Sequence, residues 1–199
     1  MIDALFGSRT RVKLLNLFMN HPGQSFYVRE ITRTIGEQIN SVRRELSNLL
    51  EVGVIISNST DNKLFYEVNQ RYDYYLALRA MFAGEPIHPE KMAVGDDSGQ
   101  IGEIIGGISQ ALRLAIIAGV LVKGSASPLD VILVGNMPKD KVSSAMKMIE
   151  KIEGREINYA VLPYDEFYHR LSVHDKFITQ VINNKHSVII DTDNVLSQN

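Results

Sequence analysis

The side chains best suited to do chemistry lie on one segment of the chain, residues 39–52. Its apolar residues recur at the spacing of one face of an α-helix; they are Ile39, Val42, Leu46, Leu49 and Leu50. A rotation of about 100° per residue places Arg44 almost opposite that face. The polar residues around Arg44 are Asn40, Ser41, Arg43, Ser47 and Asn48. Because Arg, Asn and Ser side chains hydrogen-bond to base edges in the major groove, which accepts one α-helix, we expect these six residues to contact DNA bases.

The flanking residues predict the elements that position this segment. A first helix begins after Ser8, a good N-cap, and a brief second helix ends at Gly36. Two strand-like runs, residues 54–57 and 64–68, follow the third helix, and a fourth helix covers about 72–82. A helix, a tight turn, a second helix and a two-stranded hairpin form the arrangement that places a helix in the major groove.

Phosphate contacts are expected from basic and hydroxyl residues beside the third helix. They are Arg9 and Arg11 at the start of the first helix, and Arg29, Thr32 and Arg33 on the second. Lys63 is the only basic residue of the hairpin, whose polar tip spans 58–63, so we expect the hairpin to add little affinity.

A helix face with two arginines is also typical of an ordinary solvated surface, and similar helices serve protein–protein contacts. A protein-interaction adaptor therefore stays an open alternative.

The composition limits the class of protein. With 199 residues, 45 % of them hydrophobic, the chain can bury one ordinary core or two small ones. The absence of cysteine excludes disulfides, thiolate metal sites and cysteine nucleophiles, and the five histidines show no metal-ligand spacing. No apolar run approaches the roughly 18 residues of a membrane span, and the first residues lack the order of a signal peptide. We therefore expect a soluble, cytoplasmic protein without membrane contact.

A change of composition near the middle of the chain predicts two domains, 1–84 and 101–199. The stretch 84–100 holds two prolines, three glycines and no periodicity, which predicts a linker over 85–100. The first domain has ten Lys and Arg against eight Asp and Glu, whereas residues 85–199 have eleven against fifteen. A mildly basic first half beside an acidic second half suits a DNA-contacting module joined to a domain of another kind.

The second half alternates predicted helices and strands. Helices are expected over 101–113, 139–153, 164–171 and 176–183, and strands over 114–122, 129–135, 156–162 and 187–191. Continuous apolar runs such as 129–135 are typical of strands covered on both faces. This half predicts an α/β domain on a mixed sheet, and the whole chain an α+β protein.

The first half resembles a known family. The stretch VREITRTIGEQINSVRRELSNLLEVGVI resembles the helix-turn-helix of prokaryotic winged-helix regulators of the arsenic-repressor type, and SNSTDNKLFYEVNQ resembles their wing. The likeness covers about residues 6–82. It implies a winged helix-turn-helix transcriptional regulator that binds double-stranded DNA through residues 39–52. Since palindromic DNA needs two copies of the recognition helix, a homodimer is expected.

The second half resembles the nucleotidyltransferase-like domain of the DNA polymerase β superfamily. The likeness is clearest in GREINYAVLPYDEFYHRLSVHDKFITQVINNKHSVIID, residues 154–191. Active relatives carry Gly-Ser, Arg-Gly and Ser-Asp-x-Asp, whose carboxylates hold the metal ions of phosphoryl transfer. The corresponding stretch here is AGVLVKGSASPLDVILVG, in which Val120 takes the serine position and Asp130 is the one remaining carboxylate. Asn158 takes the position of the third carboxylate.

One carboxylate does not build a two-metal site, so the resemblance implies a degenerate domain. We expect no catalytic residue, no metal and no cofactor. A vestigial phosphate site is a candidate; its residues are Gly119, Lys123, Gly124, Ser125 and Asp130. Three hypotheses follow: a regulator whose second domain dimerises or senses an unknown small-molecule or nucleotide effector, a nucleotidyltransferase that its first domain targets to DNA, and the adaptor.

Overall fold

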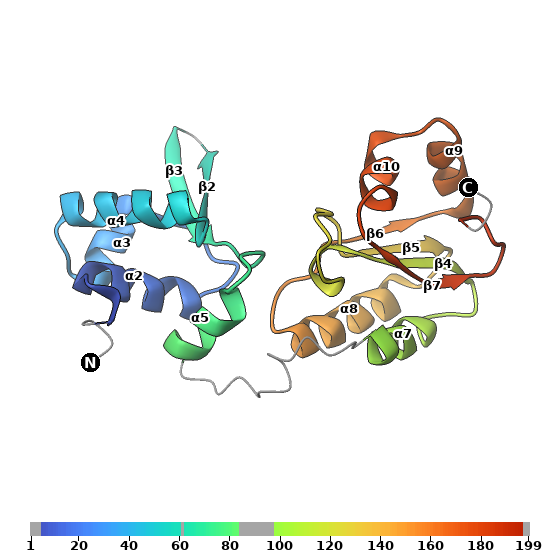
Figure 1. Cartoon of the computed structure of the whole chain (residues 1–199), viewed down its shortest axis with the longest axis horizontal. Helices are drawn as coiled ribbons and strands as arrows, with labels where there is room; N and C mark the ends of the chain where they lie inside the picture. The colour runs from blue at the N-terminus through green and yellow to red at the C-terminus, as the bar shows by residue number, and fades with distance from the viewer. Residues whose placement is uncertain (1–4, 61, 84–97, 197–199) are drawn as a thin grey trace. The chain divides into compact units, whose positions relative to one another are not determined.

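The computed structural model describes residues 5–60, 62–83 and 98–196, and the chain divides into two compact units, Met1–Met92 and Ala93–Asn199. The described residues form eight α-helices and two sheets, one three-stranded and one four-stranded (Figure 1). The protein is therefore of mixed α+β class. The predicted linker, 85–100, lies outside the described residues except for 98–100, which begin a helix.

The first unit has four described helices, several of whose ends lie at residues that the sequence marks. They are α2 (Arg9–Asn20), α3 (Val28–Ile35), α4 (Ile39–Val52) and α5 (Tyr75–Phe82). Ser8 caps α2, because its hydroxyl oxygen accepts the amide N–H of Arg11. Gly36 and Gly53 end α3 and α4 in the left-handed conformation that glycine adopts without strain. These ends confirm the predicted ones, although α5 begins at Tyr75 rather than near residue 72.

The three-stranded sheet consists of β1 (Phe26–Tyr27), β2 (Ile55–Thr60) and β3 (Lys63–Val68), in the order β1-β3-β2 and antiparallel throughout. The hairpin of β2 and β3 is longer than predicted, since its pairing continues to Thr60 and Lys63. Backbone hydrogen bonds hold this outer part of the ribbon. The residues by which it exceeds the prediction, Asn58, Ser59, Thr60 and Lys63, are polar and exposed, so the sequence pattern there is that of a loop.

The core of the first unit confirms the apolar face predicted for α4. Val42, Leu46 and Leu49 are buried, and Ile39 and Leu50 are half-buried at its margins. Val42, Leu46, Leu49 and Leu50 meet large side chains of the other helices and of the sheet, including Phe18 and Ile31. The opposite side of α4 is left to solvent.

The second unit has a mixed sheet with helices on both faces. Its strands are β4 (Leu112–Ile117), β5 (Val131–Gly135), β6 (Tyr159–Leu162) and β7 (Ser187–Asp191), in the order β6-β5-β4-β7. Only the β5–β6 pair is parallel among the described strands. The helices α7 (Ser98–Gly106) and α8 (Lys139–Glu153) cover one face, and α9 (Tyr164–Ser172) and α10 (Lys176–Ile182) cover the other (Figure 1).

The two faces explain the continuous apolar runs of β4 and β5. Ala115 and Leu133 belong to the core beneath α7 and α8, whereas Leu114 and Ile132 belong to the core beneath α9 and α10. Successive side chains of a strand point to opposite faces, so a strand between two cores is apolar at every position.

Several predicted bounds in this unit are wrong. The helix expected over 101–113 begins at Ser98 and ends at Gly106, and the strand expected over 114–122 begins earlier, at Leu112, and ends at Ile117. A 3-10 helix, η1 (Gly119–Leu121), follows it. The N–H of Ala118 still donates to the backbone carbonyl of Asp130, but the next two N–H groups leave the ladder. That of Gly119 donates to Oγ of Ser125, and that of Val120 donates to the carboxylate of Asp130. The strand expected over 156–162 is likewise shorter at its start, since β6 begins at Tyr159.

Gly119 provides a test of this packing. Its φ is +51°, and a Cβ there would overlap Oδ1 of Asp130 and lie 2.9 Å from the carbonyl oxygen of Leu129. Gly124 has a φ of +81° and open space where a Cβ would lie. We expect Gly119→Ala to destabilise the second unit by more than about 3 kcal/mol, and Gly124→Ala by about 1 kcal/mol, the strain of the left-handed backbone alone. Amide hydrogen exchange of β5 measures both losses, and equal values would contradict the overlap.

Candidate functional site

The exposed side of α4 brings together the residues predicted to contact bases. Asn40, Ser41, Arg43, Arg44 and Ser47 are exposed, and Asn48 is half-buried. The side chain of Arg44 is 79 % exposed, so its guanidinium is accessible from solvent. The helix therefore presents two arginines and several amide and hydroxyl groups on the side that faces away from its own core.

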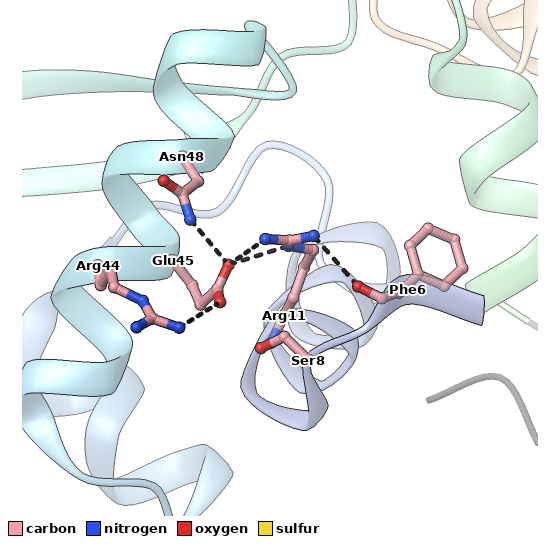
Figure 2. A network of polar contacts seen from close by, with 6 residues as sticks. All are labelled: Phe6, Ser8, Arg11, Arg44, Glu45 and Asn48. Carbon is pink, nitrogen blue, oxygen red and sulfur yellow. Dashed lines mark hydrogen bonds and ion pairs between the residues drawn. The ribbon is translucent and has the colours of Figure 1, made fainter. Parts of the chain in front are cut away.

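Glu45 is an unexpected member of this helix, because its side chain is only 2 % exposed. Its Oε2 accepts hydrogen bonds from Nε of Arg11 at 2.9 Å and from Nδ2 of Asn48 at 3.2 Å (Figure 2). The second terminal nitrogen of Arg11 also lies 2.9 Å from Oε2, which makes the contact an ion pair. On the outer side, a guanidinium nitrogen of Arg44 lies 3.8 Å from Oε1.

The same network reaches the chain before α2. The other terminal nitrogen of Arg11 donates to the carbonyl oxygen of Phe6 at 3.1 Å, and Figure 2 shows Phe6, Arg11 and Glu45 in one connected group. Arg11, a predicted phosphate contact, therefore has its charge balanced by Glu45, although its side chain is 34 % exposed. The sequence contains no local signal for this pair, since the two residues are 34 positions apart.

The surroundings of Glu45 keep it ionised. Burial acts to raise the pKa of its carboxyl group, but hydrogen bonds from Ser8, Asn48 and Arg11, together with the charge of Arg11, hold that pKa below its ordinary value of 4.5. The group is thus a carboxylate at neutral pH, and a carboxylate only accepts hydrogen bonds.

A second ion pair positions the start of α4. Nζ of Lys13 lies 2.7 Å from Oε1 of Glu37 and donates to the carbonyl oxygen of Ile35 at 2.8 Å. The hydrogen bond from Lys13 is the main cause that lowers the pKa of Glu37. Lys13 on α2 therefore holds the turn between α3 and α4.

The predicted phosphate-contacting residues are differently placed. Arg29 and Arg33 are exposed on α3, and Lys63 is exposed at the start of β3. Thr32 is half-buried, and its hydroxyl donates to the carbonyl oxygen of Val28 at 2.7 Å. Its proton is therefore engaged by its own helix.

Asp130 has a visible structural role in the second unit. It is fully buried, and its Oδ1 accepts the N–H of Val120 at 2.9 Å while its Oδ2 accepts the N–H of Asn158 at 2.8 Å. The side chain thus joins η1, the start of β5 and the segment before β6.

The other residues of the candidate phosphate site are Gly119, Lys123, Gly124 and Ser125. The N–H of Gly119 donates to Oγ of Ser125 at 3.0 Å, so this donor is engaged within the chain. Lys123 and Gly124 are exposed. An anion site at these residues stays a prediction.

An open cavity of about 540 Å³ lies beside this region. Its lining includes Asn158, Tyr159, Phe177 and Gln180, and the described side chains around it are apolar, aromatic or amide groups. Such a lining offers no charge to balance a phosphate. Within the described residues, we find no group of three or more His, Cys, Asp or Glu that could hold a metal ion, and no helix long and apolar enough to cross a membrane.

Comparisons with known proteins give no further assignment: no family model, no curated protein and no solved structure matches the chain. What the chain does must follow from its own residues and their geometry.

The ion pair predicts a pH-dependent difference between wild type and Glu45→Gln. Because the pKa of Glu45 is lowered on folding, its contribution to stability is complete above about pH 5 and is lost as the pH falls through the folded-state pKa, below 4.5. At pH 7 we expect the substitution to cost about 1–3 kcal/mol, the range for a hydrogen-bonded charge. Urea unfolding at pH 7 and pH 3.5 measures the difference, which should shrink at the lower pH.

The matched control for that experiment is Glu51→Gln, an exposed carboxylate on the same helix. Its substitution should change the free energy of unfolding by less than about 0.5 kcal/mol at either pH. A difference for Glu45→Gln that is the same at both pH values would contradict the ion-pair account.

Proposed function

We propose that this protein is a sequence-specific DNA-binding transcriptional regulator of the winged-helix class, with α4 as the recognition helix in the major groove. The observation that carries the proposal is the side of α4 that bears Asn40, Arg44 and Asn48. It is rich in groups that hydrogen-bond to bases, and the buried ion pair of Arg11 and Glu45 lies beside it, between α2 and α4. Such a combination suits a helix that must keep one orientation in a groove.

The neighbouring elements support the proposal. The helix α3, the turn after Gly36 and α4 have the order of a helix-turn-helix, and the hairpin of β2 and β3 corresponds to the wing. The exposed cations Arg29, Arg33 and Lys63 lie on these flanking elements, where they suit phosphate contacts.

In this proposal the second unit does no chemistry. Both oxygens of Asp130 accept backbone N–H groups, and the nearby cavity is lined without charged side chains among the described residues. Dimerisation or the sensing of an effector is the role that we assign to this unit. A homodimer would present two copies of α4 to an inverted repeat of DNA in the cytoplasm of a prokaryotic cell.

Selection of bound duplexes from a random pool tests the proposal. We expect an inverted repeat whose half-sites lie about 10 base pairs apart, or a multiple of that distance. Enrichment of no sequence would contradict the proposal and favour the adaptor. Incorporation of labelled nucleotide in the presence of Mg²⁺ would favour the nucleotidyltransferase.

Two substitutions separate base contacts from phosphate contacts. Arg44→Ala should weaken binding to the selected site by about 5- to 150-fold and relax the preference at one base position, since a bidentate contact contributes about 1–3 kcal/mol of discrimination. Lys63→Ala should weaken binding to all sequences alike. It should also reduce the slope of the logarithm of the binding constant against the logarithm of the salt concentration by about one. Titrations at several salt concentrations measure both, and unchanged specificity in Arg44→Ala would refute the assignment of α4.

A further inference from the structure

The side-chain amide of Asn48 is held in one orientation. Its Nδ2 donates to Oε2 of Glu45 at 3.2 Å, and Figure 2 shows the amide oxygen turned away from that carboxylate. An amide can rotate by half a turn and exchange its nitrogen with its oxygen. Glu45 prevents the exchange, because a carboxylate accepts hydrogen bonds and donates none.

Glu45 is itself immobilised. Two nitrogens of Arg11 lie 2.9 Å from the same Oε2, and the carboxylate is almost fully buried between α2 and α4. The orientation of Asn48 therefore depends on a group anchored in the body of the first unit rather than on a flexible surface residue.

The groups that Asn48 retains define a chemical preference. One N–H is committed to Glu45, so the amide keeps one N–H donor and the Oδ1 acceptor for an outside partner. In the major groove adenine presents an N7 acceptor beside an N6 donor, guanine presents two acceptors, cytosine a donor and thymine an acceptor. Adenine is the base whose pair of groups complements the pair that Asn48 offers.

We propose that Glu45 is a positioning residue that locks the amide of Asn48 so that α4 recognises an adenine in the major groove. The proposal rests on the DNA-binding function above and assigns part of its specificity. Asn48 lies two turns after Asn40 and one turn after Arg44 on α4, in the row of polar side chains assigned to base contacts.

The test compares wild type with Asn48→Ala and with the double variant Arg11→Met/Glu45→Met. The double variant replaces both charges by apolar side chains of similar length, so it leaves no unpaired buried charge and does not alter the net charge. Its matched control is Lys13→Met/Glu37→Met, which removes a different ion pair of α2 and leaves Glu45 and Asn48 in place. Thermal melting of each variant reports whether it folds.

For each protein, duplexes are selected from the random pool, and affinities are measured for the selected site with and without an A·T to G·C change. We expect wild type to prefer adenine at one position by about tenfold or more, and Asn48→Ala to lose that preference alone. The double variant should keep the other positions and retain less than about a third of the adenine preference, while the control keeps all of it.

Three results would overturn the inference. The first is full adenine preference in Arg11→Met/Glu45→Met, and the second is unchanged preferences in Asn48→Ala. The third is loss of preference at every position in the double variant, which would mean that Glu45 only supports the helix.

A readout without DNA separates this inference from the proposed function. In wild type, one side-chain N–H signal of Asn48 in a ¹⁵N–¹H spectrum should be shifted by its hydrogen bond to Glu45, and the double variant should lose that shift. An unshifted pair of signals in wild type would overturn the inference directly. The signal could be shifted in a protein that selects no duplex. That result would mean that the amide is locked by Glu45, but that the regulator proposal and the adenine assignment have both failed.

Discussion

The contact between the guanidinium of Arg11 and the carboxylate of Glu45 places a charge inside the first unit, where an unpaired charge would cost several kcal/mol. The carboxylate is stable there because Arg11 on α2 and Asn48 on α4 donate to it, and because the positive charge of Arg11 balances its own. The Lys13–Glu37 pair makes a second contact between α2 and the turn before α4. The consequence of the Arg11–Glu45 contact reaches the polar side of α4 through Asn48, whose amide has the buried carboxylate of Glu45 as its hydrogen-bond partner.

A buried acid has a comparable structural role in the second unit, with a different consequence. Asp130 accepts two backbone N–H groups from segments before and after it in the chain, so its oxygens support the fold around η1. Glu45 instead accepts a hydrogen bond from the side-chain amide of Asn48 and so orients a side chain on an accessible surface. The proposed division of function follows this contrast, with recognition in the first unit and dimerisation or effector sensing in the second.

Much of the fold was predictable where the determining signals are local. The apolar spacing of α4, the cap at Ser8 and the glycine after Val52 each act within a few residues, and α8 was predicted with the bounds that the structure shows. Predictions of where a strand begins or ends failed where strand pairing, or a residue distant in the sequence, determines that end. The hairpin is longer because backbone pairing tolerates polar side chains. The ladder of β4 does not continue past Ala118, because the side chains of Ser125 and Asp130 accept the N–H groups of Gly119 and Val120.

The candidate site divides in the same way. Residue types and helical period were enough to gather the exposed polar residues of α4 on one side, because the period of a helix is a property of the local backbone. The buried state of Glu45 and the orientation of Asn48 needed the tertiary structure, since Arg11 is 34 positions from Glu45. The hydrogen bond from the N–H of Asn158 to Asp130 spans 28 positions, and no local pattern predicts it. No pattern within a single helix or strand encodes such contacts; they arise only when packing brings distant segments to hydrogen-bonding distance.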